Sequence, residues 1–226
     1  MDYEFSYFDA PIRPYVRENG ARVFSSLRPA RTVTVEQCHD MITSGALRAI
    51  TERVRAAATA DAMRDAKQTL LPYVTPAGVF RERRATEITA LSGCFVIDVD
   101  HLATTREAEE LRDAIGHDAR LRPLLTFVSP SGRGVKALVG YRPYRRWDWG
   151  SRAWRPSDDL SAPTEEHLGD YARCLREAML YIAEAYGVGD GAEGVDSACK
   201  DVSRACFFCH DPDAVAADVT TDPVKA

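Results

Sequence analysis

An ordered series of six patterned segments between positions 94 and 209 constrains the fold more than any other feature of this sequence. Apolar runs typical of strands alternate with two stretches whose apolar residues recur at helical spacing. In chain order the segments are Cys94–Asp100 (strand), Thr104–Ile115 (helix), Leu124–Val128 and Val135–Tyr141 (strands), Glu165–Tyr186 (helix) and Val202–Cys209 (strand). The predicted order is therefore β-α-β-β-α-β.

That order is typical of the split βαβ arrangement, an α+β fold with an RNA-recognition-like antiparallel sheet. In such a sheet the first strand lies between the third and the fourth. The carboxyl end of the first strand, the turn of the hairpin and the start of the fourth strand should therefore meet. Each of these three places is polar in this sequence, which predicts a site there.

The segment before this core predicts a mainly helical flank. Residues 1–34 look irregular, with a short strand predicted at Ala21–Leu27. A helical stretch follows Thr34, and a second one runs toward Leu71, where Pro72 ends it. We expect a mainly helical part at 1–90 packed on a core at 91–215, and a tail at 216–226.

Composition narrows the class of protein. With 226 residues, 45% of them hydrophobic, the chain can bury a substantial core. No apolar run reaches the roughly 18 residues that span a bilayer, and the acidic N-terminus does not resemble a secretory signal, so a cytoplasmic location without membrane contact is expected. The net charge of -5 disfavours nonspecific coating of nucleic acid.

Any nucleic-acid contact should therefore be local, at one of two basic clusters. The first is Arg81, Arg83 and Arg84. The second interleaves arginines with aromatic residues, which can grip phosphates and stack on bases, although a solvated surface loop explains it equally well. Its members are Tyr141, Arg142, Tyr144, Arg145, Arg146, Trp147, Trp149, Arg152, Trp154 and Arg155.

Two acids end the first predicted strand. Because side chains alternate along a strand, Asp98 and Asp100 should project from one face, about 7 Å apart, while Ile97 and Val99 enter the core. Such a pair can hold Mg²⁺ or Mn²⁺, which prefer oxygen ligands and share them with phosphates. The alternative is that the acids merely end the strand and cap the following helix.

The predicted hairpin turn contains groups that can bind phosphate. Glycines let backbone N–H groups turn toward an anion, hydroxyls can donate hydrogen bonds, and a lysine can supply a positive charge. An ordinary glycine-rich turn is the alternative. The residues concerned are Ser129, Ser131, Gly132, Gly134 and Lys136.

A third polar segment precedes and enters the predicted fourth strand. Asp196 or Asp201 can add a third carboxylate, and spacing alone does not separate them. Arg204 can meet a triphosphate through its fork of donors, with Ser203 beside it. A zinc site is a weaker alternative, built from Cys199, Cys206, Cys209 and His210, because the spacing of these residues is not that of a zinc knuckle.

Four of these segments, in this order, resemble the VirE amino-terminal-like primase-polymerase domain of the archaeo-eukaryotic primase superfamily. The resemblance covers roughly residues 30–215. It is carried by Leu71–Phe80, by Gly93–Asp100, by Phe127–Lys136, and by Asp201–Phe207 with Asp211-Pro-Asp213.

The resemblance implies an enzyme that makes DNA or RNA from nucleoside triphosphates on a single-stranded DNA template. Asp98 and Asp100 match the first acidic motif, and Lys136 stands where many members carry a histidine. Asp196, eight positions before Arg204, resembles the third acid and is preferred to Asp201. Lys67 resembles a basic position that contacts nucleic acid. Many relatives carry a helicase or a priming domain, so de novo priming should either need a separate helicase or priming partner or be absent.

Two other classes of function remain open. One is a non-catalytic module that binds single-stranded nucleic acid or nucleotides in a mobile-element replication system. Paired carboxylates disfavour it, because a binding sheet displays aromatic residues on its exposed face. The other is a metal-dependent nuclease, which would not need Lys136 and Arg204 to hold a triphosphate.

Overall fold

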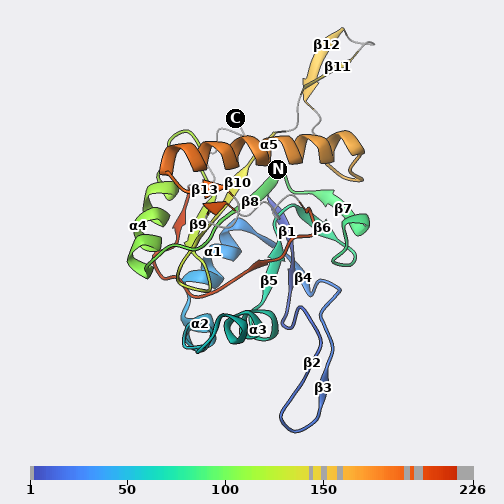
Figure 1. Cartoon of the computed structure of the whole chain (residues 1–226). Coiled ribbons are helices and arrows are strands. Elements are labelled where there is room, and N and C mark those ends of the chain that lie inside the picture. The colour runs from blue at the N-terminus through green and yellow to red at the C-terminus, as the bar shows by residue number, and fades with distance from the viewer. Residues whose placement is uncertain are drawn as a thin grey trace.

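A computed structural model describes residues 3–142, 145–148, 152–156, 160–190, 194–195 and 201–217. Within them the chain is a mixed α+β protein with several antiparallel sheets and five α-helices (Figure 1). None of the described helices is long and apolar enough to cross a membrane.

The larger sheet contains the first three of the four strands predicted for the core. Its strands, in spatial order, are β13 (Gly189–Asp190), β14 (Gly194–Val195), β8 (Cys94–Val99), β10 (Val135–Gly140), β9 (Leu125–Val128) and β16 (Val215–Ala216). All neighbours are antiparallel except β13 and β14. The predicted hairpin is β9–β10, and it lies beside β8 as expected.

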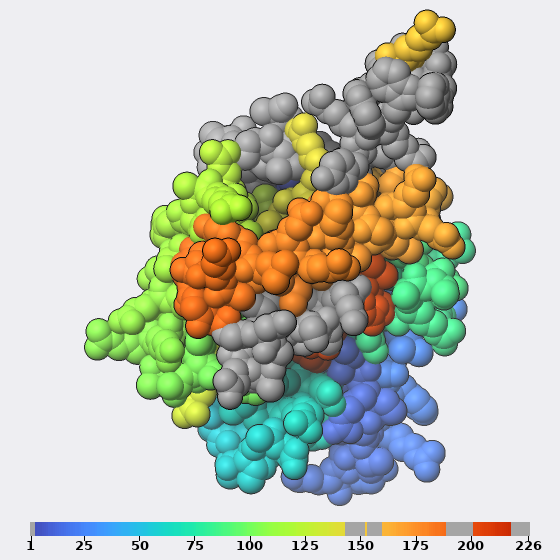
Figure 2. Space-filling view, turned by 45° about the horizontal axis from the view of Figure 1, so that its top comes forward, coloured from blue at the N-terminus to red at the C-terminus, as the bar shows by residue number. Residues whose placement is uncertain are grey.

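Helices α4 (Thr105–Gly116) and α5 (Glu165–Tyr186) pack on the strands of this sheet and cover one of its faces. On the surface, the green and orange segments that contain them lie beside each other (Figure 2). Thr104 and Thr164 cap their first turns by accepting hydrogen bonds from the backbone N–H three residues on. The ring of Tyr171 on α5 meets Phe95 of β8 edge to face, with 6.4 Å between ring centroids. The predicted helices are therefore confirmed, and they bury the odd-numbered residues of β8.

The other face of the sheet carries Asp98 and Lys136. In the register of β8 and β10 these two residues are direct cross-strand partners, and Phe127 of β9 pairs with Lys136 on its other side. Phe127 packs edge to face on Phe208, at 6.2 Å between centroids. Unlike the helix-covered face, this one therefore meets the rest of the chain and can combine charge with burial.

A second sheet, which the sequence did not predict, is built mostly from the N-terminal part. Its strands, in spatial order, are β15 (Cys206–Phe207), β5 (Tyr73–Thr75), β1 (Glu4–Phe8) and β4 (Arg31–Thr34). The expectation of an irregular segment at 1–34 is wrong, and strands accompany the helices predicted in the part at 1–90. Four of the five residues of β1 are buried, because both faces of this strand are covered, so it lacks the alternation by which an exposed strand is recognised.

The predicted helices of the N-terminal part are present. They are α1 (Val35–Thr43), α2 (Arg48–Arg55) and α3 (Ala60–Leu70), with a short 3₁₀ turn at Gly45–Leu47. Thr34 and Gln37 form a capping box at the start of α1. Pro72 follows the end of α3, as expected.

Three two-stranded hairpins lie outside these sheets. They are β2 (Tyr15–Val16) with β3 (Arg22–Val23), β6 (Gly78–Phe80) with β7 (Ile88–Leu91), and β11 (Arg145–Asp148) with β12 (Ala153–Pro156). A 3₁₀ turn, Ala85–Glu87, leads into β7. The β2–β3 hairpin extends from the body of the protein beside α3 (Figure 1).

The predicted fourth strand at Val202–Cys209 is wrong. Only Cys206 and Phe207 form a strand, and they pair with Val74 and Tyr73 of β5 in the second sheet. Asp201 accepts hydrogen bonds from the backbone N–H and the hydroxyl of Ser203, which makes a turn where the strand was expected to begin. The place next to β8 is taken by β14.

Residues on both sides of position 90 share one interior. One hydrophobic core joins residues of the N-terminal sheet, such as Phe5 and Val74, to residues of the larger sheet, such as Phe127. The return of β15 to β5 also completes the N-terminal sheet with residues from the far end of the chain. The two sheets therefore meet across a shared interior.

Candidate nucleotide and metal site

Asp98 and Lys136 form a buried ion pair on the face of the larger sheet that meets the N-terminal sheet. The Nζ of Lys136 contacts Oδ2 of Asp98, and the two residues are 7% and 6% exposed. Burial alone lowers the pKa of Lys136, but the carboxylates, Asp98 foremost, raise it above its ordinary value. Lys136 therefore stays charged at neutral pH.

The second carboxylate oxygen of Asp98 is an unsatisfied acceptor. Oδ1 is buried and has no hydrogen-bond partner among the described residues. A buried carboxylate oxygen without a donor costs free energy, so such groups are rare away from sites that bind something. A cation is the partner that this atom can use.

Asp100 follows β8 and faces the same pocket. Burial, and next the charge of Asp98, raise the pKa of the Asp100 carboxyl. Lys136 and Lys67 oppose this shift but do not cancel it. The positive charges nearby therefore do not fully offset the burial of Asp100 and its repulsion by Asp98. A divalent cation bound here would stabilise the ionised forms of both carboxyls.

The hairpin turn approaches these acids closely. A Cβ on Gly134 would lie 2.4 Å from the carbonyl oxygen of Val99 and 3.0 Å from Oδ1 of Asp100, so only glycine fits there. Gly132 has a φ of +74°, the left-handed conformation that glycine adopts freely. The hydroxyls of Ser129 and Ser131 are 2.9 Å apart. The turn therefore holds Ser129 against the acids.

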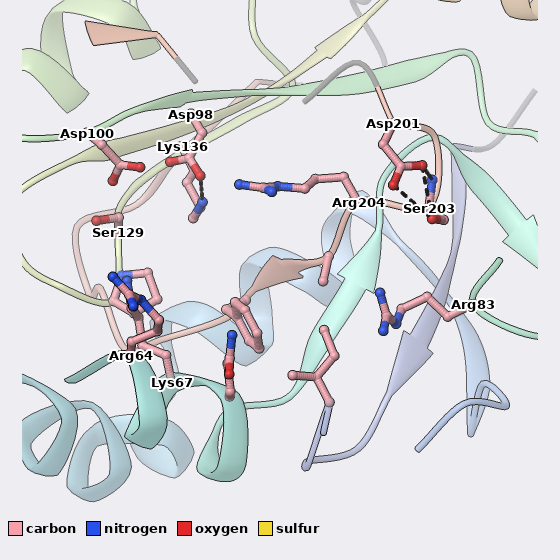
Figure 3. A pocket seen from close by; sticks show the side chains of 15 residues that line it. Arg64, Lys67, Arg83, Asp98, Asp100, Ser129, Lys136, Asp201, Ser203 and Arg204 are labelled. Carbon is pink, nitrogen blue, oxygen red and sulfur yellow. Dashed lines mark hydrogen bonds and ion pairs between the residues drawn. The ribbon is translucent and has the colours of Figure 1, made fainter. Parts of the chain in front are cut away.

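A pocket of about 380 Å³ lies between the two sheets and α3 (Figure 3). Its lining combines carboxylates, cations and a few apolar side chains. The lining residues are Ile12, Arg64, Lys67, Gln68, Arg83, Asp98, Asp100, Ser129, Pro130, Lys136, Asp201, Ser203, Arg204, Ala205 and Phe207. Eight residues predicted as site residues meet there, although they come from five separate stretches of chain.

The turn at residues 201–204 supplies one wall of the pocket. The backbone N–H of Arg204 donates to the carbonyl of Asp201 at 2.9 Å, and the side chain of Arg204 extends toward the Asp98–Lys136 pair (Figure 3). The carboxylate of Asp201 bonds Ser203 instead, at 2.9–3.2 Å. No three metal-ligating side chains cluster within the described residues, so Asp201 does not join the two acids.

Asp196, the preferred third acid, lies outside the described residues, as does Cys199. The residue before Asp196 in the chain, Val195, pairs with Val99 of β8. Val99 stands between the two acids of the pair. Val195 therefore lies beside the strand that carries the acids.

Helix α3 contributes three polar residues to the pocket, of which only Lys67 was singled out from sequence. Arg64 and Gln68 were missed. Their spacing of three and four positions places Arg64, Lys67 and Gln68 on one helical face, a signal that the sequence contained. Burial lowers the pKa of Lys67, while the charge of Asp100 acts in the opposite direction.

The first basic cluster is divided. Arg83 lines the pocket and lies over the ring of Tyr73, 5.8 Å from its centroid. Its Nε is buried without a hydrogen-bond partner among the described residues. Arg81 and Arg84 are exposed and do not line the pocket, and Arg84 pairs with Glu82 at 3.6 Å. Arg83 is the member of the cluster that the fold turns inward.

The second basic cluster lies largely outside the residues whose side chains are described. Of its members, Tyr141 is buried in the core against Phe95, and Arg142 is exposed.

Two of the possible zinc ligands have other partners. Cys209 donates from Sγ to the carbonyl of Val128 at 3.1 Å, and both ring nitrogens of His210 have polar neighbours.

These contacts define what the pocket can bind. Asp98 and Asp100 have the chemistry to hold Mg²⁺ or Mn²⁺, and the unpartnered Oδ1 of Asp98 fits such an ion. Around the acids stand the cations of Lys67, Lys136 and Arg204, which can bind phosphate oxygens. The pocket therefore suits a ligand that brings both a divalent cation and several negative charges.

Comparison with known proteins gives one match. The family model described as BT4734-like, N-terminal domain, matches residues 65–215, more than half of the chain. The matched segment contains every pocket residue except Ile12 and Arg64. No curated protein and no solved structure matches the chain.

Proposed function

We propose that this chain, which belongs to the family of BT4734-like N-terminal domains, is a metal-dependent nucleotidyltransferase of the primase-polymerase kind. One observation carries the proposal: Asp98 and Asp100 share a pocket with Lys67, Lys136 and Arg204. A volume of about 380 Å³ suits a small ligand. Among such ligands, a nucleoside triphosphate with its divalent cation matches both charge signs.

The acids and the cations have separate roles in this proposal. Mg²⁺ or Mn²⁺ held by Asp98 and Asp100 supplies the Lewis acid that such transfers use. Lys67 and Arg204 bind and orient the triphosphate, and Ser129 donates a hydrogen bond to it. Lys136 holds Oδ2 of Asp98, which would leave Oδ1 available to hold a cation. Positioning and charge neutralisation account for most of the rate in reactions of this class.

The order of strands supports an RNA-recognition-like core. The split βαβ fold places its first strand between the third and the fourth. Here β8 lies between β10 and β14, with β9 beyond β10. In this proposal β14 serves as the fourth strand, and Asp196, which follows it directly in the chain, is the third acid.

The resemblance to the VirE amino-terminal-like primase-polymerase domain supplies the rest of the proposal. The template is single-stranded DNA, and the product is DNA or RNA made from nucleoside triphosphates. A separate helicase or priming partner acts with the chain. Arg83, at the end of the pocket away from Asp100 in Figure 3, contacts nucleic acid.

Synthesis on single-stranded DNA tests the proposal. Primed and unprimed templates are incubated with labelled dNTPs or NTPs, in Mg²⁺ or in Mn²⁺, with the parent protein and with the double variant Asp98→Asn, Asp100→Asn. We expect metal-dependent product from the parent alone. A matched control is Glu109→Gln, which changes an exposed acid on α4. Product of equal yield from the double variant would refute the assignment of the acids.

A binding module without chemistry is the second candidate, and the Asp98–Lys136 ion pair is the observation that favours it. Lys136 already neutralises Asp98, so the pocket can persist without a metal ion. Such a module would bind nucleotide equally well in EDTA and in Mg²⁺. Calorimetric titration of ATP under both conditions distinguishes the candidates, because the enzyme needs the cation to hold the triphosphate.

A further inference from the structure

The hairpin arm, residues 13–28, concentrates exposed apolar side chains. It contains β2, β3 and their connection, in which the N–H of Arg17 donates to the carbonyl of Ala21. Four large hydrophobic side chains are exposed in the described part of the chain, and three of them lie in the arm: Val16 (62%), Phe24 (79%) and Leu27 (38%). Exposed apolar groups gathered in this way mark a binding surface more often than chance exposure.

The arm combines these exposed apolar side chains with an arginine, Arg22. Val16 and Arg22 are cross-strand partners, so their side chains share a face. Phe24 follows the end of β3 directly and is the most exposed of the three apolar side chains. Arg22 makes no ion pair with any described residue. An aliphatic side chain, a guanidinium and an aromatic ring are therefore exposed close together on the arm.

The charge of the arm contrasts with that of the whole chain. Residues 13–28 contain four arginines (Arg13, Arg17, Arg22 and Arg28) and one acid, Glu18, in a chain whose net charge is -5. Arg13 pairs with Asp65 of α3 and Arg28 with Glu82, at the base of the arm. Arg17 and Arg22, nearer its tip, have no acidic partner among the described residues. The outer part of the arm is thus locally basic.

The base of the arm is continuous with the pocket. Ile12, which lines the pocket, donates its N–H to the carbonyl of Gln68 at 2.9 Å. Arg83, another lining residue, donates its N–H to the carbonyl of Leu27 at 2.8 Å. Tyr73 donates from its hydroxyl to the carbonyl of Ser26, also at 2.8 Å. A strand that leaves the pocket on this side meets the arm first.

We infer that the arm binds single-stranded nucleic acid beside the pocket, by stacking on Phe24 and by phosphate contacts to Arg17 and Arg22. Base stacking on an aromatic ring and arginine contacts to the backbone are the two contributions that single-strand binding uses. The inference rests on the proposed function for its direction, because the strand held by the arm is the template. A second copy would explain the apolar groups but not Arg17 and Arg22, which have no ion-pair partner among the described residues. A membrane surface would explain both the apolar groups and the arginines but not their continuity with a pocket of mixed charge.

The experiment measures binding apart from synthesis. Anisotropy of a fluorescein-labelled oligo-dT of about 20 nucleotides, longer than one typical site, reports the Kd. The test variant is Arg22→Ser, Phe24→Ser. The matched control is Arg106→Ser, Leu180→Ser, which removes the same charge and an exposed apolar side chain from helices outside the arm. We expect the test variant to weaken binding at least about tenfold, as stacking losses do, and the control to change it less than twofold.

The two contributions separate in salt. If Arg22 holds one phosphate, Arg22→Ser alone should reduce the slope of log K against log salt by about 0.7. Phe24→Ser alone should weaken binding without changing that slope. Equal slopes for the two single variants would overturn the assignment of Arg22 to a phosphate.

Failure of this inference is distinguishable from failure of the proposed function. The Asp98→Asn, Asp100→Asn protein should bind the oligonucleotide at least as tightly as the parent, since it keeps the arm. Unchanged affinity in the arm variant overturns the inference even if synthesis is observed. Weakened affinity without synthesis by the parent supports the arm and removes the enzyme. If size-exclusion chromatography shows the parent as a dimer and the arm variant as a monomer, with unchanged DNA affinity, the arm is a self-association surface and the inference is overturned.

Discussion

Two buried ion pairs in this protein have nearly the same exposed fractions. They differ in whether both carboxylate oxygens of the acid have hydrogen-bond donors among the described residues. Arg112 on α4 pairs with Asp211 at 2.9 Å, and the two residues are 5% and 4% exposed. Lys136 and Asp98 are 7% and 6% exposed. Burial therefore does not distinguish them, and the difference lies in what else each carboxylate contacts.

Asp211 has donors for both oxygens. Its Oδ1 accepts from Arg112 and from the N–H of Asp213, and its Oδ2 accepts from the N–H of Val128 at 2.7 Å. Asp98 has one partner, Lys136, and a buried oxygen with none among the described residues. Asp211 also joins α4 to β9 and to the C-terminal segment, whereas Asp98 faces the pocket. A satisfied carboxylate holds elements together, and an unsatisfied one keeps its capacity to bind a ligand.

The largest expected effect is on catalysis, at the unsatisfied pair. Asp98→Asn should lower the rate of synthesis by at least about 10³-fold, or about 4 kcal/mol of barrier, because the amide cannot replace a carboxylate on a divalent cation. Single-turnover primer extension measures it, with Glu109→Gln as the control. A loss under tenfold would show that Asp98 is not a metal ligand.

The next effect is on stability, at the satisfied pair. Arg112→Met should lower the free energy of unfolding by about 3–5 kcal/mol, because Asp211 then stays buried without its cation. Urea denaturation measures the change. Arg106→Met on the same helix breaks an exposed pair with Glu110 and should cost less than about 1 kcal/mol. Equal effects of the two variants would contradict the difference drawn between buried and exposed pairs.

A third prediction concerns metal and lysine as alternative partners of Asp98. Lys136→Met should lower the free energy of unfolding by about 1–3 kcal/mol in EDTA, since a buried acceptor loses its donor. Mg²⁺ should restore part of that stability, because a ligand that binds only the folded state stabilises it. Thermal unfolding with and without Mg²⁺ tests this prediction, with Arg112→Met as the comparison. An equal response of both variants to Mg²⁺ would argue against a cation at Asp98.

The smallest effect has the opposite sign. Burial and the charge of Asp98 raise the pKa of Asp100, so the folded chain binds that proton more tightly than the unfolded chain. The stability from this group is complete below the ordinary aspartate pKa of about 3.9 and is lost as pH rises through the raised folded value. In EDTA at pH 7, Asp100→Asn should therefore stabilise the protein, by up to about 1 kcal/mol. Urea denaturation in EDTA measures the change, and a lower free energy of unfolding for Asp100→Asn at pH 7 would contradict this prediction.

Local patterns predicted the helices and three strands of the larger sheet. Thr104 and Thr164 mark the starts of α4 and α5, and alternation places Asp98 with the buried ion pair and Ile97 in the core. The glycines around Ser129 predict the hairpin. Each of these signals is short-range, since a cap, a turn or an alternation is decided within a few residues.

Long-range partners were not predictable in the same way. Cys206 and Phe207 look like a strand in any sheet, but only the free edge of β5 decides which sheet they join. Arg64 and Gln68 are ordinary surface residues of a helix until α3 packs against the pocket. Spacing alone did not separate Asp201 from Asp196, and only the fold shows that the carboxylate of Asp201 bonds Ser203 at one wall of the pocket.

The sequence by itself determined the chemistry of this protein: which residues carry charge, which positions require glycine, and where helices begin. Only the tertiary structure decided that the carboxylates of β8, the cations of α3 and the turn at 201–204 line one pocket. The physical reason is range. Side-chain chemistry and local backbone preference are encoded residue by residue, whereas the proximity of distant segments follows from how a whole chain buries its apolar surface.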